Sequence, residues 1–356
     1  MIMIGDMVIK MQKIMNNKKT ISILAILLCL LMLLCGCKGK NEEAPAEEQS
    51  DEGISTLYGD ESLGIDPVVD EQLKDYRLIA LFGIDDGDRN DMDIIISVNK
   101  NDGTAKLVSV IRDSYVQILE ETADHGAAYN RCNLGYPRGG KYEAMKVLNR
   151  NLDLNIRECI CVDWPCAAHL IDTLGGLTVD VDEGMLDWIN QGAGLAQYGA
   201  ENYEIASAGT QTLNGWQAVQ YLRVRKYDNG GTIARAHHNE DVFLQLYDQA
   251  KNMSASEIAD IYDEIADELD TNMSRNTLTD TLAQIATTDI EKTDEWPYEW
   301  TQMEDAENGY RVPMSLVSNV KELHKVMFGQ EDYVPSTVVQ EINDGMIEKE
   351  KSLVEF

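Results

Sequence analysis

The chain has 356 residues and is strongly acidic, with 62 Asp and Glu against 30 Lys and Arg and a formal net charge of −32 at pH 7. This balance argues against nucleic acid as a partner, because binding to its phosphates draws on clustered Lys and Arg. A phosphate-bearing ligand would therefore need a local basic cluster or a divalent cation.

The N-terminal segment predicts export. Four lysines within residues 10–19 precede an uncharged apolar run over residues 20–34, which is the pattern of a secretory signal. The run ends in Leu-Cys-Gly-Cys and resembles the lipobox of bacterial lipoproteins, which would make Cys37 the lipidated residue of an anchor formed by residues 1–37. An uncleaved N-terminal anchor is the alternative. Both interpretations place the folded part on the extracytoplasmic face of the cell membrane.

The next segment, residues 38–71, is rich in Glu, Asp, Ala and Ser. It contains too little apolar surface to offset the entropy lost on ordering, so it is predicted to be an acidic flexible linker. A globular domain is expected over residues 72–330, followed by a C-terminal tail over residues 331–356.

Apolar runs at residues 78–83, 94–98 and 107–111 are typical of buried strands. An Asp-Gly pair lies between the second and third runs, and this pair favours a β-hairpin. If the turn centres between residues 101 and 102, Asp91 pairs opposite Arg112. Asp85 ends the preceding strand and is joined to Asp91 by a short polar loop.

Two carboxylates and a guanidinium would thus gather at one edge of the sheet. Converging Asp side chains suit a hard cation such as Mg²⁺, which takes one or two carboxylates together with phosphate oxygens. A solvated acidic turn with a surface ion pair is the alternative for these residues taken alone.

Helices alternate with further strands after the hairpin. Pro165 and the Gly-Gly pair at 175–176 mark the two ends of a helix, and alternating apolar and polar residues at 177–181 predict a strand with one exposed face. More helices are expected around residues 218–222 and 316–323. The interleaved order predicts one α/β domain with a central mixed β-sheet and helices on both faces. Four cysteines in this domain lack disulfide-framework or zinc spacing and are expected to be buried free thiols: Cys132, Cys159, Cys161 and Cys166.

A second basic feature is the pair Arg223 and Arg225. On a strand, residues two apart share a face, so this pair could bind a diphosphate through paired N–H groups. Pairing with nearby carboxylates is the alternative. Arg235 is a more distant third member.

Several ordered segments resemble the LytR–CpsA–Psr family. The segments are residues 83–85 and 89–94, residues 110–116, residues 131–133 with the Gly-Gly pair at 139–140, residues 174–181, and residues 209–225. Together they cover about residues 75–245 in the order typical of the family.

The resemblance implies an extracytoplasmic phosphotransferase that moves an anionic glycopolymer, such as a teichoic acid or capsule polysaccharide, from a polyprenyl diphosphate carrier to peptidoglycan. It implies an α-β-α sandwich with an apolar pocket for the prenyl chain. Family roles carried onto matching positions make Asp85 and Asp91 the Mg²⁺ ligands. They make Arg112, Arg223, Arg225 and Arg235 the diphosphate-binding residues.

Two departures from the family pattern affect the expected activity. Ile111 stands where the family usually has Pro before the first arginine, and residues 229–236 lack one arginine and a glutamine of the usual block. A catalytically weakened paralogue that binds the polyprenyl-linked polymer without transferring it is therefore the alternative function.

Overall fold

The computed structural model describes residues 59–84, 89–122, 126–192, 195–223, 260–281 (except 262 and 279), 290–304 and 309–354. These residues divide into two compact units. Unit 1 comprises the described part of Val162–Leu269 and Arg275–Ile290. Unit 2 comprises the described part of Lys38–Cys161, Asp270–Ser274 and Glu291–Phe356.

The central sheet has six strands in the order β10–β3–β2–β1–β6–β9. The strands are β1 (Tyr76–Ile84), β2 (Asn90–Asn99), β3 (Ala105–Val110), β6 (Glu158–Val162), β9 (Asp270–Thr271) and β10 (Ile290–Lys292). The pairs β1–β2, β2–β3 and β6–β9 are antiparallel, and a parallel bridge joins Val110, at the end of β3, to Trp296. The predicted α/β class with a mixed central sheet is confirmed.

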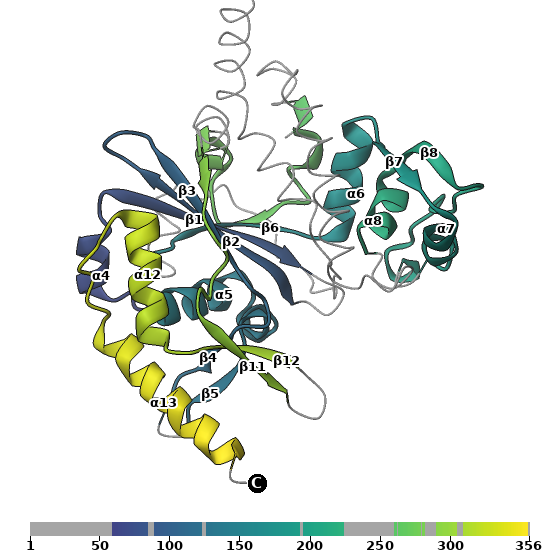
Figure 1. The fold of residues 1–356 in the computed structure, drawn as a ribbon. Helices are drawn as coiled ribbons and strands as arrows, with labels where there is room; N and C mark the ends of the chain where they lie inside the picture. The colour runs from purple at the N-terminus through teal and green to yellow at the C-terminus, as the bar shows by residue number, and fades with distance from the viewer. Residues whose placement is uncertain are drawn as a thin grey trace, which may run out of the picture. The chain divides into compact units, whose positions relative to one another are not determined.

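Strand β1 lies at the centre of the packing in unit 2. Every residue from Leu78 to Ile84 is buried, as expected of a strand covered on both faces. Helices α5 (Tyr136–Leu152) and α12 (Leu316–Phe328) contribute Met145 and Leu323 to the same core cluster as Phe82. Figure 1 shows both helices beside strands β1–β3. The predicted helix around residues 316–323 is confirmed by α12.

The ordered core extends beyond the boundaries expected from the sequence. Before residue 72, Leu63 and Ile65 are buried, and Asp66 caps helix α4 (Pro67–Gln72) by accepting hydrogen bonds from the first backbone N–H groups of that helix. Residues 59–71 of the expected linker therefore contribute to the core of unit 2.

The segment expected as a C-terminal tail also forms part of this core. It contains helix α13 (Thr337–Val354), in which Val339, Ile342 and Met346 are buried. These residues form an apolar stripe at helical spacing on a helix whose other positions are mostly polar or acidic. The helix lies against α12, α5 and β4 (Figure 1).

Two small antiparallel pairs complete unit 2. Strands β4 (Tyr115–Leu119) and β5 (Ala128–Arg131) form one pair, and β11 (Trp300–Glu304) and β12 (Gly309–Pro313) form the other. The short helix η1 (Cys132–Leu134) follows β5 directly. The rings of Tyr115 and Tyr310 meet edge to face with centroids 5.4 Å apart, so the two pairs pack together.

Unit 1 is built around helix α6 (Trp164–Thr173), which begins where Asp163 accepts a hydrogen bond from the Cys166 N–H. The remaining elements are β7 (Leu177–Val181), α7 (Glu183–Asn190), η2 (Ala196–Tyr198), β8 (Gly209–Leu213) and α8 (Gly215–Arg223). Strand β7 alternates between buried and exposed residues, as predicted. A Cβ at Gly215 would collide with the backbone of Ala168, so glycine permits the close contact of α8 with α6.

Candidate active site

The hairpin formed by β2 and β3 has the predicted register. Its ladder pairs Val98 with Ala105 and ends with Asp93 opposite Val110. The same register continued for two residues would bring Asp91 opposite Arg112, but the ladder ends at Asp93 and Val110, so this pairing stays a prediction. Arg112 itself lies in the turn after β3, because β3 ends at Val110.

The two predicted metal ligands are not described at the level of side chains. Asp91 is part of strand β2, but its side chain is outside the described set, and Asp85 lies outside the described residues. Among the described residues, no group of three or more His, Cys, Asp and Glu could hold a metal ion. Asp85 and Asp91 as Mg²⁺ ligands therefore remain a prediction.

Arg112 is part of a compact charge cluster with Asp113 and Arg131. The Arg112 Nε atom lies 3.4 Å from Oδ2 of Asp113, and the Arg131 Nε atom lies 3.2 Å from Oδ1 of the same carboxylate. The three side chains are only 22–30% exposed. One carboxylate thus holds two guanidinium groups, and the cluster carries a net positive charge in a strongly acidic protein.

Arg131 is held from a second side by the β11–β12 hairpin. Its guanidinium lies over the Tyr310 ring, 5.4 Å from the centroid, where the ring's negative face attracts a cation. This contact, together with the ion pair to Asp113, limits the rotamers open to Arg131. A preorganised guanidinium loses less entropy when it binds an anion.

The backbone of the turn that carries Arg112 and Asp113 is hydrogen-bonded to three separate segments. Such a turn positions its side chains more precisely than a free surface loop would. The bonds run from the Ile111 N–H to the Trp296 carbonyl (2.9 Å), from the Arg311 N–H to the Asp113 carbonyl (3.0 Å) and from the Asn133 N–H to the Arg112 carbonyl (3.2 Å).

Buried polar groups lie beneath this turn. Asn90 donates a side-chain hydrogen bond to Asp93 and accepts one from the Tyr136 N–H, and both Asn90 and Asp93 are 1% exposed. Burial, reinforced by the charge and hydrogen bond of Asp93, raises the pKa of the Cys132 thiol well above its ordinary value. Cys132 is therefore neutral and serves packing rather than nucleophilic chemistry. All four cysteines of the domain are free and buried, as predicted.

Arg223 belongs to unit 1, where it is the last residue of helix α8. Its guanidinium lies 5.4 Å from the ring centroid of the buried Trp164. Arg223 and Arg225 were expected to share one face of a strand, and this expectation is wrong at Arg223. The apolar residues of α8 continue at helical spacing, so the helix extends to Arg223. Arg225, Arg235 and the altered block at 229–236 lie outside the described residues, as does Cys37.

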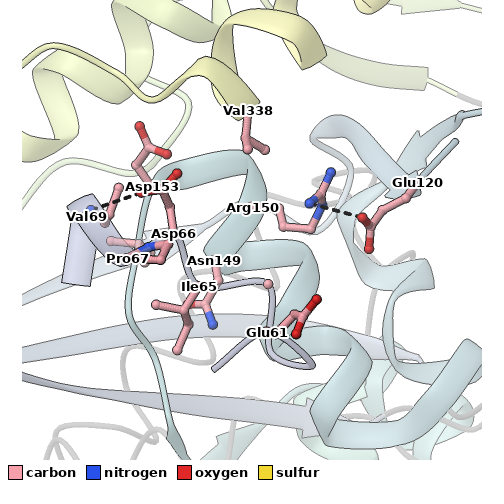
Figure 2. A pocket seen from close by; sticks show the side chains of 12 residues that line it. Glu61, Ile65, Asp66, Pro67, Val69, Glu120, Asn149, Arg150, Asp153 and Val338 are labelled. Atoms are coloured by element: carbon pink, nitrogen blue, oxygen red, sulfur yellow. Dashed lines mark hydrogen bonds and ion pairs between the residues drawn. The ribbon is translucent and has the colours of Figure 1, made fainter. Parts of the chain in front are cut away.

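A separate cavity of about 320 Å³ in unit 2 is unsuited to a diphosphate. Figure 2 shows Glu61, Asp66, Glu120 and Asp153 among the side chains that line it, with Arg150 as the single basic one. Glu120 already engages this arginine, at 3.1 Å. None of the predicted site residues lines this cavity.

The sequence interpretation missed Asp113, Arg131 and Tyr310 as parts of the cluster. Asp113 and Arg131 lie inside the segments that carry the family resemblance, so the signal for them was present. Tyr310 is 179 positions after Arg131 along the chain, and no local pattern connects the two.

Comparisons with known proteins identify the family of the chain. Residues 39–326 match the LytR_cpsA_psr family. The chain belongs to the LytR–CpsA–Psr family. The teichoic acid transferase TagT of Bacillus subtilis is 25% identical over 269 residues, which are 73% of this chain and 78% of TagT. TagV of the same organism is 27% identical over 265 residues, 73% of this chain but only 63% of TagV.

Solved structures of the family share the fold. The crystal structure of B. subtilis TagV matches with a TM-score of 0.53 and 23% identity, covering 74% of this chain and all but 1% of the other. TagT bound to LIIa-WTA matches with a TM-score of 0.51 and 22% identity, covering 73% and 92%. No helix among the described residues is both long enough and apolar enough to cross a membrane.

Proposed function

We propose that this member of the LytR–CpsA–Psr family transfers an anionic glycopolymer from a polyprenyl diphosphate carrier to peptidoglycan outside the cell membrane. The relatives that support this proposal are named polyisoprenyl-teichoic acid–peptidoglycan teichoic acid transferases. The observation that carries it is the cluster of Arg112, Asp113 and Arg131, which gathers positive charge at the end of the β2–β3 hairpin.

The chemistry proposed is attack by a sugar hydroxyl of peptidoglycan on the glycan-proximal phosphorus of the donor. A new P–O bond joins the polymer to the acceptor, the bond to the bridging oxygen breaks, and the polyprenyl monophosphate leaves. The hydroxyl proton passes to a carboxylate of the site. Phosphoryl transfer of this kind depends mainly on positioning and on neutralising charge.

Each residue has a role in this scheme. Arg112 and Arg131 bind phosphate oxygens of the donor, with Asp113 holding their guanidinium groups in place. Asp85 and Asp91 would hold Mg²⁺, since carboxylate oxygens are the ligands that this hard cation prefers; when bound, the cation would neutralise charge on the diphosphate. Arg223, Arg225 and Arg235 are proposed as further phosphate ligands.

The membrane attachment is part of the proposal. Cys37 would carry the lipid, or residues 1–37 would remain as an anchor, and either arrangement would keep the domain near a carrier whose prenyl chain lies in the bilayer. A carrier embedded in the bilayer would require the enzyme to act at the membrane surface.

The proposal is tested by a transfer assay with a short-chain prenyl diphosphate donor. Arg112→Ala should slow transfer by about 10- to 100-fold, because a charge-assisted hydrogen bond contributes roughly 1.5–3 kcal/mol. Arg275→Ala is the matched control: it also removes an arginine that is paired with a carboxylate, Asp263. Equal rates in the two variants, with both folded, would refute the assignment of Arg112.

A further inference from the structure

The outer face of the β11–β12 hairpin carries an exposed aromatic side chain next to an arginine. Trp300 keeps 39% of its surface exposed, whereas Trp164 and Trp296 are almost completely buried. The Arg311 guanidinium lies over the Trp300 ring, 4.6 Å from its centroid. The strand register explains this contact, since Gln302 pairs with Arg311 and Trp300 with Pro313, so Trp300 and Arg311 are diagonal neighbours on one face.

This face differs from the opposite face of the same hairpin. Tyr310 and Val312, which alternate with Arg311, are buried in the core of unit 2. The outer face instead presents an indole, a guanidinium and the exposed amide side chain of Gln302. We call Trp300, Gln302 and Arg311 the hairpin platform. Exposed Met314 follows β12, and its N–H bonds to the carbonyl of Glu299, directly before Trp300.

Arg311 differs from most of the other arginines that the structure describes, because those form ion pairs with carboxylates. Arg77 pairs with Glu158, and Arg157 pairs with both Asp60 and Asp70. Within the part of the chain that the structure describes, no carboxylate lies at ion-pair distance from Arg311, and its guanidinium contacts the Trp300 ring. Contact with a ring consumes none of the N–H donors of a guanidinium, so the platform offers a cation whose donors suit an anionic ligand.

The platform is physically continuous with the candidate active site. The Arg311 N–H donates to the carbonyl of Asp113 at 3.0 Å, and Arg311 forms a parallel bridge with Ser114. The residue whose side chain contacts Trp300 is therefore hydrogen-bonded through its backbone to the turn that carries Arg112. A polymer bound through its phosphate at Arg112 would therefore lie next to a platform that is hydrogen-bonded to the same turn.

We infer that the hairpin platform binds a sugar–phosphate segment of the transferred glycopolymer, adjacent to the diphosphate site. The apolar C–H face of a sugar ring would stack on the exposed part of the Trp300 indole, Gln302 would hydrogen-bond sugar hydroxyls, and Arg311 would bind a backbone phosphate. The identity of the ligand as a glycopolymer rests on the proposed function. A phospholipid surface would also accept an exposed Trp and Arg, and its binding is an outcome of the test. The backbone hydrogen bond from Arg311 to Asp113, in the turn that carries Arg112, favours the polymer.

The test measures binding of a carrier-free, soluble teichoic acid chain to the full-length protein in detergent. Trp300→Ala should weaken binding by about 3- to 10-fold, the range expected for loss of an aromatic contact. Arg311→Gln should weaken binding and reduce its dependence on salt concentration. Two controls should bind as the parent does: Val334→Ala, which truncates an exposed apolar side chain elsewhere in unit 2, and Arg275→Gln, which removes one positive charge from unit 1.

Further probes separate the chemistry of the ligand. Inorganic phosphate should compete only weakly, and any binding of phosphatidylglycerol vesicles should be the same in Trp300→Ala as in the parent. Displacement of the glycan by phosphate alone would show an anion site and overturn the inference, as would Trp300-dependent binding of vesicles without binding of the glycan. If Trp300→Ala fails to fold, two other variants decide the question: Trp300→Phe, which keeps a ring, and Arg311→Gln. Parental affinity for the glycan in both variants would overturn the inference.

The outcome is independent of donor turnover because the probe lacks a diphosphate. A parent protein that shows Trp300-dependent glycan binding but no cleavage of a prenyl diphosphate donor would refute the proposed function and leave the platform standing. Donor cleavage that depends on Arg112, combined with glycan binding that is unchanged in Trp300→Ala, would support the proposed function and refute the platform.

Discussion

The shared carboxylate of Asp113 offers a test of how the active-site arginines are held. We predict that Asp113→Asn lowers kcat by about 10-fold while KM for the diphosphate donor stays the same or falls. The substitution keeps the size of the side chain but removes the charge that lies 3.4 Å from Arg112 and 3.2 Å from Arg131. The two guanidinium groups would then attract a diphosphate more strongly, but from less defined positions.

The magnitude follows from the burial of the cluster. At an effective dielectric constant of about 20, each pair would be worth about 5 kcal/mol as bare Coulomb energy. The side chains are 22–30% exposed, however, so solvent screening and side-chain entropy reduce the net value to about 1 kcal/mol for each pair. If poorer orientation of the guanidinium groups raises the activation free energy by about 1.4 kcal/mol, kcat falls tenfold.

The assay is steady-state cleavage of a short-chain prenyl diphosphate donor, measured at low and high salt. Asp113→Glu should recover part of the activity, because it restores the charge. Asp180→Asn, on the exposed face of β7 in unit 1, removes a carboxylate away from the cluster and should leave kcat unchanged. Unchanged kcat and KM in folded Asp113→Asn would contradict the positioning role of this carboxylate.

Three further predictions concern stability and attachment. Val339→Ala, at a completely buried position of α13, should lower the free energy of unfolding by about 1–3 kcal/mol in chemical denaturation; a change below about 0.5 kcal/mol would show that residues 337–354 are a dispensable tail. Burial lowers the pKa of His324 despite opposing hydrogen bonds to Gln330 and the Leu152 carbonyl. The unfolded chain therefore binds more protons than the folded one, and the free energy of unfolding should fall as the pH drops below about 6.5. An identical pH dependence of stability in His324→Gln would exclude this histidine as the cause. Cys37→Ser should block removal of residues 1–36 if the cysteine is lipidated, and intact-mass measurement finding those residues on the parent protein would favour an uncleaved anchor.

The sequence carried enough information to predict the local geometry around the hairpin. An Asp-Gly turn between two apolar runs fixed the β2–β3 register, because side chains alternate with a period of two and each residue of one strand then has a defined partner. The boundaries of α6 followed from Pro165 near its start and from Gly175 and Gly176 after its end, both of which adopt positive φ. These features depend on neighbours in the chain, which a sequence displays directly.

Features set by packing across long separations were not predictable in the same way. Arg131 meets Tyr310 only because two small strand pairs, far apart in the sequence, pack through the ring of Tyr115. Helix α13 was overlooked because its many polar and charged residues obscure a narrow apolar stripe. Arg223 was expected on a strand from the spacing of two arginines alone, although Ala218, Val219 and Leu222 continue a helical pattern up to it.

The most direct test of the account follows both products of the proposed reaction. The full-length protein is incubated with a short-chain prenyl diphosphate donor that carries a labelled anionic glycan and with peptidoglycan fragments as acceptor. The account predicts release of the prenyl monophosphate in an amount equal to the glycan that becomes attached to the acceptor through a phosphodiester, with both products reduced about 10- to 100-fold in Arg112→Ala. A donor that binds the protein but is recovered intact, with no glycan on the acceptor, would contradict the assignment as a transferase and identify a protein that only binds the lipid-linked polymer.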